Sequence, residues 1–251
     1  MIDKETEQNE ISFFATYYGE GTYNRTGWLL RMKREVQTLQ RTTRLKTFGK
    51  ILSIGCGDGL FEVLLSPVAE HIVALDISPE AIEVARENAQ RKGFDNLDFR
   101  CMSVTEMDFK EQFDAVICLS FLHHVTGEAL TSLLQQTCKL LKPGGFFYSV
   151  DPYRDGLLRR IGRAILGSRY HKYHSPDEVE MHPKEFISKR TSAGYANVQI
   201  GYTHFSLLPA LYIFDEQPGW LMYPFYWLDG LWCASPLAPL ASEFTVLANK
   251  R

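Results

Sequence analysis

The sequence predicts an α/β fold with a doubly wound, mostly parallel β-sheet. Between residues 50 and 151, short apolar runs alternate with amphipathic helical stretches, which is the pattern of consecutive strand–helix–strand units. A cluster of glycines follows the first apolar run directly. The 251 residues, of which 45% are hydrophobic and 23% are charged, are sufficient for one large globular domain.

The regular half of the chain supplies five of the expected strands, at 50–54, 71–76, 97–102, 113–119 and 146–151. Ser78 and Pro79 are typical of a helix start, as N-cap and first helical residue, and Gly93 is typical of that helix's end. Apolar residues at helical spacing predict a further helix between 126 and 141. This half forms the ligand-binding core, 50–153.

The flanks are less regular, and we expect them to belong to the same single domain, 1–251. Residues 1–49 predict an N-terminal helical cap, with an amphipathic helix that begins at Thr26. Residues 154–251 predict a basic amphipathic helix at 157–166 and strands at 195–205 and 242–249. Between those strands lies an apolar insert, 206–240, which holds three of the four tryptophans and is interrupted by five prolines.

Charge and cysteine usage exclude several classes of protein. The net charge of −3 argues against a nucleic-acid-binding protein. The five cysteines are scattered, with no C-x-x-C pair, so neither a disulfide framework nor a structural zinc site is expected. The polar N-terminus does not resemble a secretory signal, and no run of about 18 apolar residues is present. A cytoplasmic protein is predicted.

The glycines at 55, 57 and 59 lie between a strand and a helix, where a side chain would keep a ligand away from the backbone. The helix start also offers free N–H groups. A dinucleotide fingerprint would need its third glycine at position 60, which is Leu60, and no Gly-Lys-Ser/Thr follows for a phosphate loop. The spacing therefore does not favour a pyrophosphate or triphosphate ligand.

Asp76 follows Gly55 by 21 residues and ends the second predicted strand. A carboxylate in this position accepts hydrogen bonds from both hydroxyls of a ribose in doubly wound folds. The pattern favours a ligand that has a ribose and lacks a pyrophosphate. The alternative is local structure only, with the glycines in a tight turn and Asp76 leading into the turn before Ser78.

Four segments, in this order, resemble the motifs of class I S-adenosylmethionine-dependent methyltransferases, of the small-molecule type: Ile51–Gly59, Val73–Ser78, Phe113–Leu119 and Leu141–Gly145. The resemblance implies a Rossmann-like, seven-stranded sheet with an antiparallel last strand, and S-adenosyl-L-methionine as cofactor. It implies that the methionine moiety of the cofactor contacts Gly55, Cys56, Gly57 and Leu119. It also implies that Asp76 binds the ribose, and that Ile77, Ser103 and Val104 contact the adenine.

Two positions depart from the family pattern. The family usually has an acid where this chain has Ser53, and an Asp where it has Ser103. The first departure removes a charge that helps to orient the amino group of the cofactor. The second replaces the acceptor for the adenine amino group with a hydroxyl, which can still accept a hydrogen bond.

His123 and His124 follow the fourth predicted strand, at the edge of the sheet where ligands bind. A histidine suits the deprotonation of an acceptor at neutral pH, so His124 is the first candidate for a general base or substrate contact and His123 the second. Either could instead cap the next helix or pack beneath the site. The segment lacks the E-x-x-E-H pattern of the cation-dependent quinone methyltransferases, so no metal is predicted.

The acceptor is expected to be a small hydrophobic or lipid-like molecule, because the flanks that build the acceptor pocket in this family are aromatic here. Candidate substrate-binding residues are Tyr17, Tyr18, Trp220, Tyr223 and Trp227. The insert could form a lid over the substrate, contact the inner face of a membrane together with the basic helix, or add a layer to the core. An Asp-Pro-Pro-Tyr-like motif is missing after the fourth strand, which argues against a nucleic-acid acceptor.

The resemblance thus implies methyl transfer from S-adenosylmethionine to an O, C or N atom of such a molecule. Two alternatives stay open: a non-catalytic module that binds S-adenosylmethionine, and another transferase that uses the same cofactor on this fold. The sequence does not indicate the oligomeric state.

Overall fold

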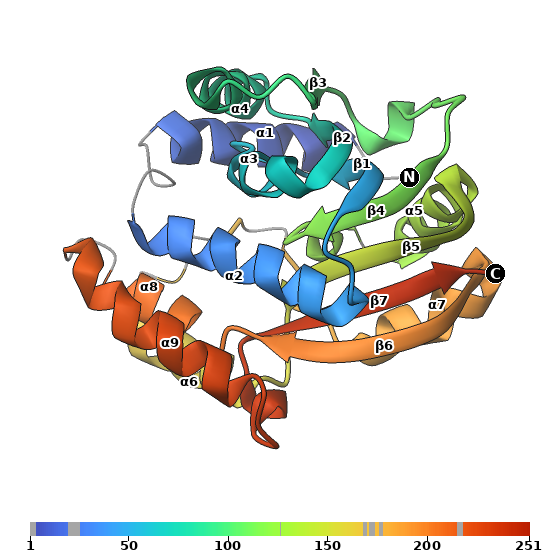
Figure 1. The fold of residues 1–251 in the computed structure, drawn as a ribbon. Coiled ribbons are helices and arrows are strands. Elements are labelled where there is room, and N and C mark those ends of the chain that lie inside the picture. Colours follow the sequence, from blue (N-terminus) through green and yellow to red (C-terminus); the bar gives the residue numbers. More distant parts are fainter. Residues whose placement is uncertain are drawn as a thin grey trace.

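The computed structural model describes residues 4–19, 26–125, 127–167, 170, 174–175, 178–214 and 218–251. Its centre is a seven-stranded sheet in the order β3-β2-β1-β4-β5-β7-β6 (Figure 1). The strands are β1 (Phe48–Ile54), β2 (Ala69–Asp76), β3 (Leu97–Cys101), β4 (Phe113–Leu119), β5 (Leu141–Pro152), β6 (Tyr195–Thr203) and β7 (Glu243–Lys250). All seven predicted strands are therefore present.

The pairing of the strands confirms the doubly wound, mostly parallel sheet. Strands β3, β2, β1, β4 and β5 pair in parallel, whereas β7 runs antiparallel to both β5 and β6. Strand β5 begins at Leu141, earlier than predicted, because Leu141 pairs with Phe113 before the register shifts. The strand order reverses between β1 and β4, which is the point at which doubly wound sheets bind ligands.

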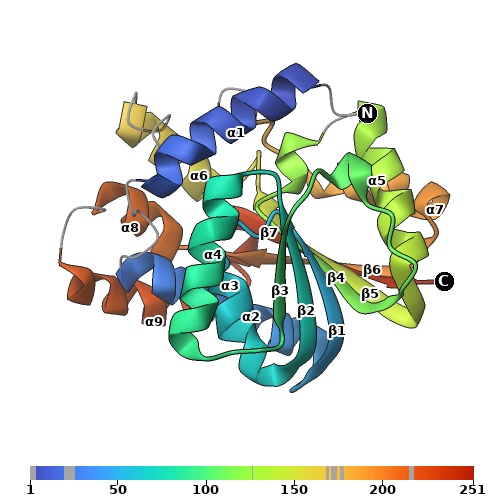
Figure 2. The ribbon, with the colours of Figure 1, turned by 90° about the horizontal axis from the view of Figure 1, so that it is seen from above.

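Helices cover both faces of the sheet (Figure 2). On one side lie α2 (Thr26–Thr43), α3 (Leu60–Leu65) and α4 (Pro79–Lys92), and on the other lie α5 (Gly127–Leu140) and α7 (Pro183–Ala193). Each face buries its own apolar cluster, because parallel strands covered on both sides are apolar on both sides. This arrangement holds the carboxyl ends of the strands in fixed positions.

The predicted boundaries of α4 are confirmed. The Ser78 hydroxyl accepts a hydrogen bond from the Ala81 N–H at 3.2 Å, and Pro79 is the first helical residue. Gly93 ends the helix in the left-handed conformation, with φ of 72°. Short 3₁₀ turns occur at η2 (Ser66–Val68), η3 (Val104–Glu106), η4 (Leu122–His124), η6 (Gly219–Leu221) and η7 (Ala238–Leu240).

The N-terminal cap consists of α1 (Lys4–Gly19) and α2. Helix α1 lies across one end of the sheet (Figure 2), and its residues Glu7, Glu10 and Phe14 face the cavity described below. Tyr17 and Tyr18 belong to α1, but their side chains lie outside the described part of the structure. Their assignment to the acceptor site stays a prediction.

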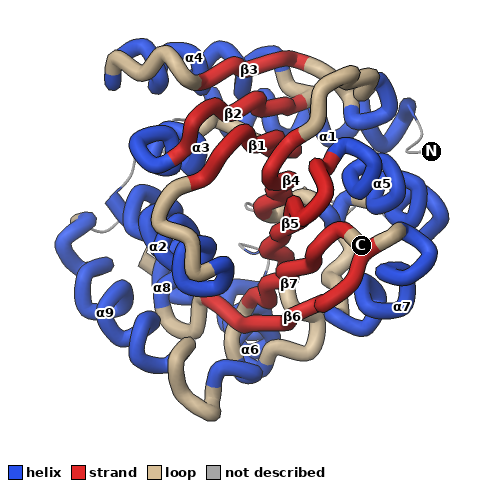
Figure 3. Tube along the Cα trace, turned by 45° about the vertical axis from the view of Figure 1, so that its right-hand side comes forward, coloured by secondary structure: helices blue, strands red, loops and turns tan. Residues whose placement is uncertain are grey.

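The C-terminal elements lie together beside α2 (Figure 3). They are α6 (Leu157–Leu166), α8 (Leu207–Ile213) and α9 (Met222–Trp232), and the last two form the apolar insert between β6 and β7. The inner sides of α8 and α9 build a third apolar cluster with Trp28 and Leu30 of α2. None of the helices among the described residues has both the length and the apolarity that crossing a bilayer requires.

Candidate active site

A cavity opens at the carboxyl ends of β1, β2 and β4, beside the reversal of strand order. It brings together every residue assigned above to the cofactor, and both histidines: Gly55, Cys56, Gly57, Asp76, Ile77, Ser103, Val104, Leu119, His123 and His124. These residues come from four separate loops, so only the fold makes them neighbours.

The turn after β1 requires glycine for two reasons. Gly55 adopts φ of 73°, a left-handed conformation that side chains disfavour, and a Cβ there would lie 2.5 Å from the ring of Phe121. Gly57 also has a positive φ, and its N–H donates a hydrogen bond to Asp76 at 2.8 Å. The turn therefore brings bare backbone to the cavity and fastens it to β2.

The carboxylate of Asp76 is held from two sides. One oxygen accepts from the Gly57 N–H at 2.8 Å and the other from the Ser78 N–H at 3.0 Å. Burial raises the pKa of Asp76 above its usual value, and these backbone hydrogen bonds counteract the effect. The side chain of Asp76 is thus fixed, and it lines the cavity at the end of β2. A residue that binds the ribose of a ligand would need to lie in such a position.

A glutamate accompanies Ser53, the first position that departs from the family pattern. The Ser53 hydroxyl donates a hydrogen bond of 2.6 Å to Glu62, which belongs to α3 and lines the cavity. The second carboxylate oxygen of Glu62 is buried and has no hydrogen-bond partner among the described residues. A carboxylate from α3 thus lies next to the position where the family usually has an acid.

Ser103, the second position that departs from the family pattern, has a similar arrangement. Its hydroxyl donates a hydrogen bond of 2.6 Å to Glu7 of α1, which also lines the cavity. The hydroxyl in addition accepts from the Thr105 N–H at 3.1 Å and so caps η3. At both positions, therefore, the serine donates a hydrogen bond to a glutamate from a nearby helix that lines the cavity.

Three carboxylates crowd the cofactor side of the cavity. Burial raises the pKa of Asp58 to about 7 and that of Glu62 to about 7, and Asp76 adds further repulsion to both. Buried like charges are costly unless a cation joins them. This side of the cavity is therefore suited to a positively charged ligand.

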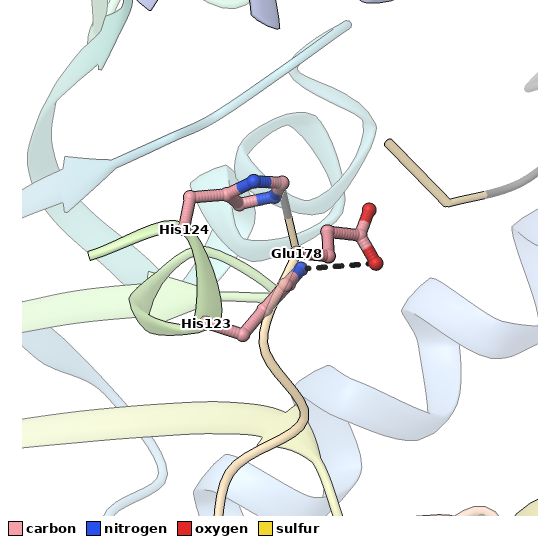
Figure 4. Close-up of side chains that lie close together, drawn as sticks. All are labelled: His123, His124 and Glu178. Atoms are coloured by element: carbon pink, nitrogen blue, oxygen red, sulfur yellow. Dashed lines mark ion pairs between the residues drawn. The ribbon is translucent and has the colours of Figure 1, made fainter. Parts of the chain in front are cut away.

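The two histidines differ in their surroundings, although their ring centroids are only 4.1 Å apart. His123 is buried, with Nδ1 at 3.2 Å from Asp151 and Nε2 at 3.7 Å from Glu178 (Figure 4). Burial opposes the charge on His123, but the two carboxylates prevail and raise its pKa to about 9. The same contact lowers the pKa of Glu178 to about 2, against the effect of burial.

His123 is consequently an imidazolium between two carboxylates and a poor proton acceptor at neutral pH. His123, His124 and Glu178 bring candidate metal-ligand atoms within 4.8 Å of one another. We interpret the group as an ion-pair network because His123 carries the proton that a metal would have to displace. The absence of a metal stays a prediction.

His124 is the better placed of the two for proton transfer. Its Nδ1 lies 3.2 Å from Glu10 of α1, and its ring meets that of Phe14 edge to face at 5.9 Å. Glu10 is itself fixed by the Ser175 hydroxyl, which donates to it at 2.6 Å. Nδ1 of His124 makes no hydrogen bond to any described residue, so Glu10 acts on the ring through its charge, which favours the imidazolium that forms when the ring accepts a proton.

Beyond the histidines, the cavity wall combines aromatic rings with charged side chains. Phe14, Trp28 and Tyr212 supply the rings, and Arg31 and Arg159 supply buried cations. The sequence predicts a largely apolar acceptor pocket, and the wall combines apolar surface with these two charged side chains.

Both arginines are paired. Arg31 donates to Glu243 at 3.0 Å and to the Ser120 hydroxyl at 3.0 Å. Arg159 donates to Glu180 at 2.8 Å. Helix α6 is therefore basic and amphipathic as predicted, but Arg159 lies on its buried side and not on a solvated face.

The structure does not bring Trp220, Tyr223 or Trp227 to the cavity. Trp220 and Trp227 are 68% and 70% exposed, and none of the three is among the described residues that line it. The inner side of the insert packs on α2, and among its described residues Tyr212 of α8 is the one that lines the cavity. The part of the insert that approaches the acceptor is thus α8 and not the tryptophan-rich α9.

Sequence reasoning missed several charged residues that reach the cavity from outside the loops that follow the strands. They include Glu7, Glu10, Arg31, Glu62, Arg159 and Glu178. Glu62 carried a weak signal, because it lies within two helical turns of the glycine cluster. The others are single charged residues in helices or irregular segments, where a solvated position is the ordinary expectation.

Comparison with known proteins agrees with this geometry. Residues 51–145 match the family model described as "Methyltransferase domain". The chain is 29% identical over 157 residues to the "Ubiquinone biosynthesis O-methyltransferase" of Xanthomonas euvesicatoria pv. vesicatoria (strain 85-10), which covers 61% of this chain and 63% of that protein. It is 34% identical over 123 residues to the protein of the same name from Xylella fastidiosa (strain 9a5c), 48% of each chain. The chain thus covers less than two thirds of these relatives.

Solved structures show the same fold over nearly the whole chain. The DhpI–SAH complex aligns with a TM-score of 0.63 and 17% identity, covering 97% of this chain and 96% of the other. The plantazolicin methyltransferase BpumL aligns with a TM-score of 0.61 and 19% identity, covering 99% and 98%. Together, the match over residues 51–145, the strand order and the arrangement of the glycine turn identify this part of the chain as a methyltransferase domain with the class I, S-adenosylmethionine-dependent type of fold.

Proposed function

We propose that this protein transfers the methyl group of S-adenosylmethionine to an oxygen atom of a small, largely hydrophobic acceptor. The observation that carries the proposal is a single cavity in which the glycine turn, Asp76 and His124 line neighbouring walls. The cofactor side and the base would then face the same space, as a direct transfer requires.

The residues of the cofactor side fit S-adenosylmethionine. The unpartnered carboxylate oxygen of Glu62 and the raised pKa of Asp58 match the positive charge of an amino acid ammonium. Asp76 would hold the ribose, and Glu7 with Ser103 would meet the edge of the adenine. When bound, the cofactor supplies an electrophilic methyl group on a sulfonium, which needs alignment and exclusion of water more than activation.

His124 is proposed as the general base. Glu10, 3.2 Å from Nδ1, would stabilise the imidazolium that forms when the ring accepts the proton of an acceptor hydroxyl. His123 would not compete for this proton, because its pKa of about 9 keeps it charged. Its role would be to fix the turn after β4 through Asp151.

The acceptor is proposed to be an amphipathic molecule with an aromatic or otherwise apolar body and an acidic hydroxyl. Phe14, Trp28 and Tyr212 would contact the body, while the buried charges of the wall would orient polar substituents. The relatives named as ubiquinone biosynthesis O-methyltransferases support both oxygen as the methylated atom and a hydrophobic acceptor.

The test is incubation of the purified protein with methyl-labelled S-adenosylmethionine and a lipid extract, followed by analysis of the labelled product. We expect label in an organic-soluble compound. His124→Ala should remove turnover while calorimetry still shows binding of S-adenosylhomocysteine. His71→Ala, on β2 and away from the described lining of the cavity, is the matched control and should behave as the unchanged protein.

Two results would contradict parts of the proposal. Retention of the cofactor without any labelled product, across lipid and aromatic acceptors, would favour a binding module. Equal loss of turnover and of cofactor affinity in His124→Ala would remove the base assignment, since a base contributes to the reaction and not to cofactor binding.

A further inference from the structure

Large apolar side chains are exposed mainly on one part of this protein. Among the described residues, all of them except Leu45 and Val179 lie in two segments, 157–165 and 213–237. These segments contain α6, the end of α8 and α9, which lie along one side of the molecule (Figure 2). Exposed apolar patches of this kind mark contact sites more often than chance.

Helix α9 carries the most exposed part of this surface. Tyr223, Trp227 and Leu231 are spaced by four residues, so they share one face of the helix, and they are 48%, 70% and 70% exposed. Trp220, one turn earlier, is 68% exposed. An apolar stripe of this length, with tryptophan and tyrosine in it, is typical of helices that lie in a membrane interface.

The polar groups of α9 point to the interior. Asp229 is fully buried and accepts from the N–H groups of Ser206 and Leu207 at 2.8 and 3.0 Å, which caps α8. Arg34 of α2 lies over the ring of Tyr226, with its guanidinium carbon 4.2 Å from the centroid. The inner side of α9 is thus held by these polar contacts, and its exposed side is left apolar.

Helix α6 repeats the arrangement with added positive charge. Leu157, Ile161 and Ile165 are spaced by four residues and are 43%, 45% and 65% exposed. Arg160 and Arg163 are exposed beside them, and Arg163 also contacts Glu180 at 3.3 Å. Between residues 192 and 249 there is no Lys or Arg, and the acids Asp229 and Glu243 in the described part of that stretch are buried.

We propose that the outer faces of α6 and α9 dock onto the surface of a phospholipid bilayer that contains anionic headgroups. The exposed charges of α6 include two arginines, which complements an anionic surface, and tryptophan and tyrosine prefer the headgroup boundary. A second copy of the chain would instead set the arginines of two α6 helices against apolar or like-charged surface. An anionic bilayer fits both the apolar stripes and the exposed arginines of this surface.

The walls of the cavity connect this surface to the active site. Arg159 of α6 and Tyr212 of α8 line the cavity, while Ile161 and Ile213, in the same helices, are exposed. A docked bilayer would therefore lie one helix away from the acceptor side. The docking surface stands independently of the methyl-transfer proposal, because its test needs neither cofactor nor acceptor.

The experiment is flotation of the full chain with vesicles of phosphatidylcholine, with and without phosphatidylglycerol. We expect the protein to float with the mixed vesicles, more weakly at high salt, and with a blue shift of tryptophan fluorescence. Trp227→Ser combined with Leu231→Ser should weaken vesicle binding by about tenfold or more, because it removes two large apolar contacts.

Leu45→Ser is the matched control, since Leu45 is 42% exposed but lies outside the proposed surface; it should float unchanged. Circular dichroism and urea unfolding show whether each variant is folded. Absence of flotation by the folded, unchanged protein would overturn the proposal. So would sedimentation equilibrium that shows a dimer dissociated by the double substitution while vesicle binding is unaffected, because the surface would then bind a second copy.

Discussion

Glu62 offers a sharp test of the carboxylate that replaces the family acid at Ser53. In Glu62→Gln the amide oxygen can still accept from the Ser53 hydroxyl, so the geometry of the pair is retained and only the charge is lost. If the charge binds the cofactor, the variant should bind S-adenosylhomocysteine about tenfold more weakly or worse, as for the loss of a charge-assisted hydrogen bond.

The same substitution should stabilise the protein in the absence of cofactor. Burial raises the pKa of Glu62 from 4.5 to about 7. One pH unit corresponds to about 1.4 kcal/mol, so the ionised carboxylate costs about 3 kcal/mol at pH 8. The amide group introduced by the substitution is buried without a hydrogen-bond partner, which costs about 1–2 kcal/mol and offsets part of the gain. We therefore expect a net gain of about 1–2 kcal/mol at pH 8.

The sign of the pH dependence follows from the raised pKa. The favourable effect of a protonated Glu62 is fully present below pH 4.5 and is lost as the pH rises through about 7. The gain in Glu62→Gln should consequently shrink on acidification. Urea unfolding at pH 8 and pH 5, with calorimetry of S-adenosylhomocysteine, measures both effects.

Glu83→Gln, on the exposed side of α4, is the control and should change neither quantity. The reasoning fails if Glu62→Gln destabilises the protein at pH 8, because the carboxylate would then be a favourable buried charge. It fails equally if the affinity for S-adenosylhomocysteine is unchanged, because the carboxylate would then not meet the ligand.

Three further predictions concern the histidines and the glycine turn. Glu10→Gln should lower kcat at least tenfold with unchanged S-adenosylhomocysteine affinity, because the protonated form of His124 loses the nearby carboxylate charge. The free energy of unfolding should fall between pH 6.5 and about 9 as His123 loses its proton, and Glu178→Gln should reduce that fall in urea titrations. Gly55→Ala should cost about 1–3 kcal/mol more than Gly144→Ala, which shares the positive φ but meets no atom within 4 Å.

The results that contradict these predictions are equally specific. Unchanged kcat in Glu10→Gln would show that His124 acts without a carboxylate partner. A pH profile that Glu178→Gln leaves unaltered would assign the loss of stability to another group. Equal unfolding free energies for the two alanine variants would show that Phe121 moves aside at no cost.

The fold was predictable because its signals are local and repeated. Each strand of the core reads as a short apolar run, and Ser78 and Gly93 punctuate α4 through their own side chain and backbone. The extension of β5 to Leu141 could not be predicted from the sequence, because a Pro-Gly-Gly sequence is typical of a turn. The strand begins earlier because Leu141 pairs with Phe113 of β4.

The candidate site was predictable only where a loop follows a strand. Asp76 ends β2 and His124 lies in the short turn that follows β4, and the topology of the sheet fixes where such residues lie. Glu7 and Glu10 reach the cavity because α1 crosses the end of the sheet, and no pattern within α1 specifies that packing. Trp227 illustrates the opposite case, since an aromatic residue gives the same sequence signal on a pocket wall and on an outer surface.

Helix α6 separates two environments with a single layer of backbone, since Arg159 faces the cavity and Ile161 faces outward. Each residue of an α-helix is rotated by about 100° from the one before it. Inserting or deleting one residue in the preceding loop would leave the helix free to compensate, but the same change inside α6 would turn the guanidinium away from Glu180. The protein should therefore tolerate substitutions along α6 far better than changes in the length of this helix.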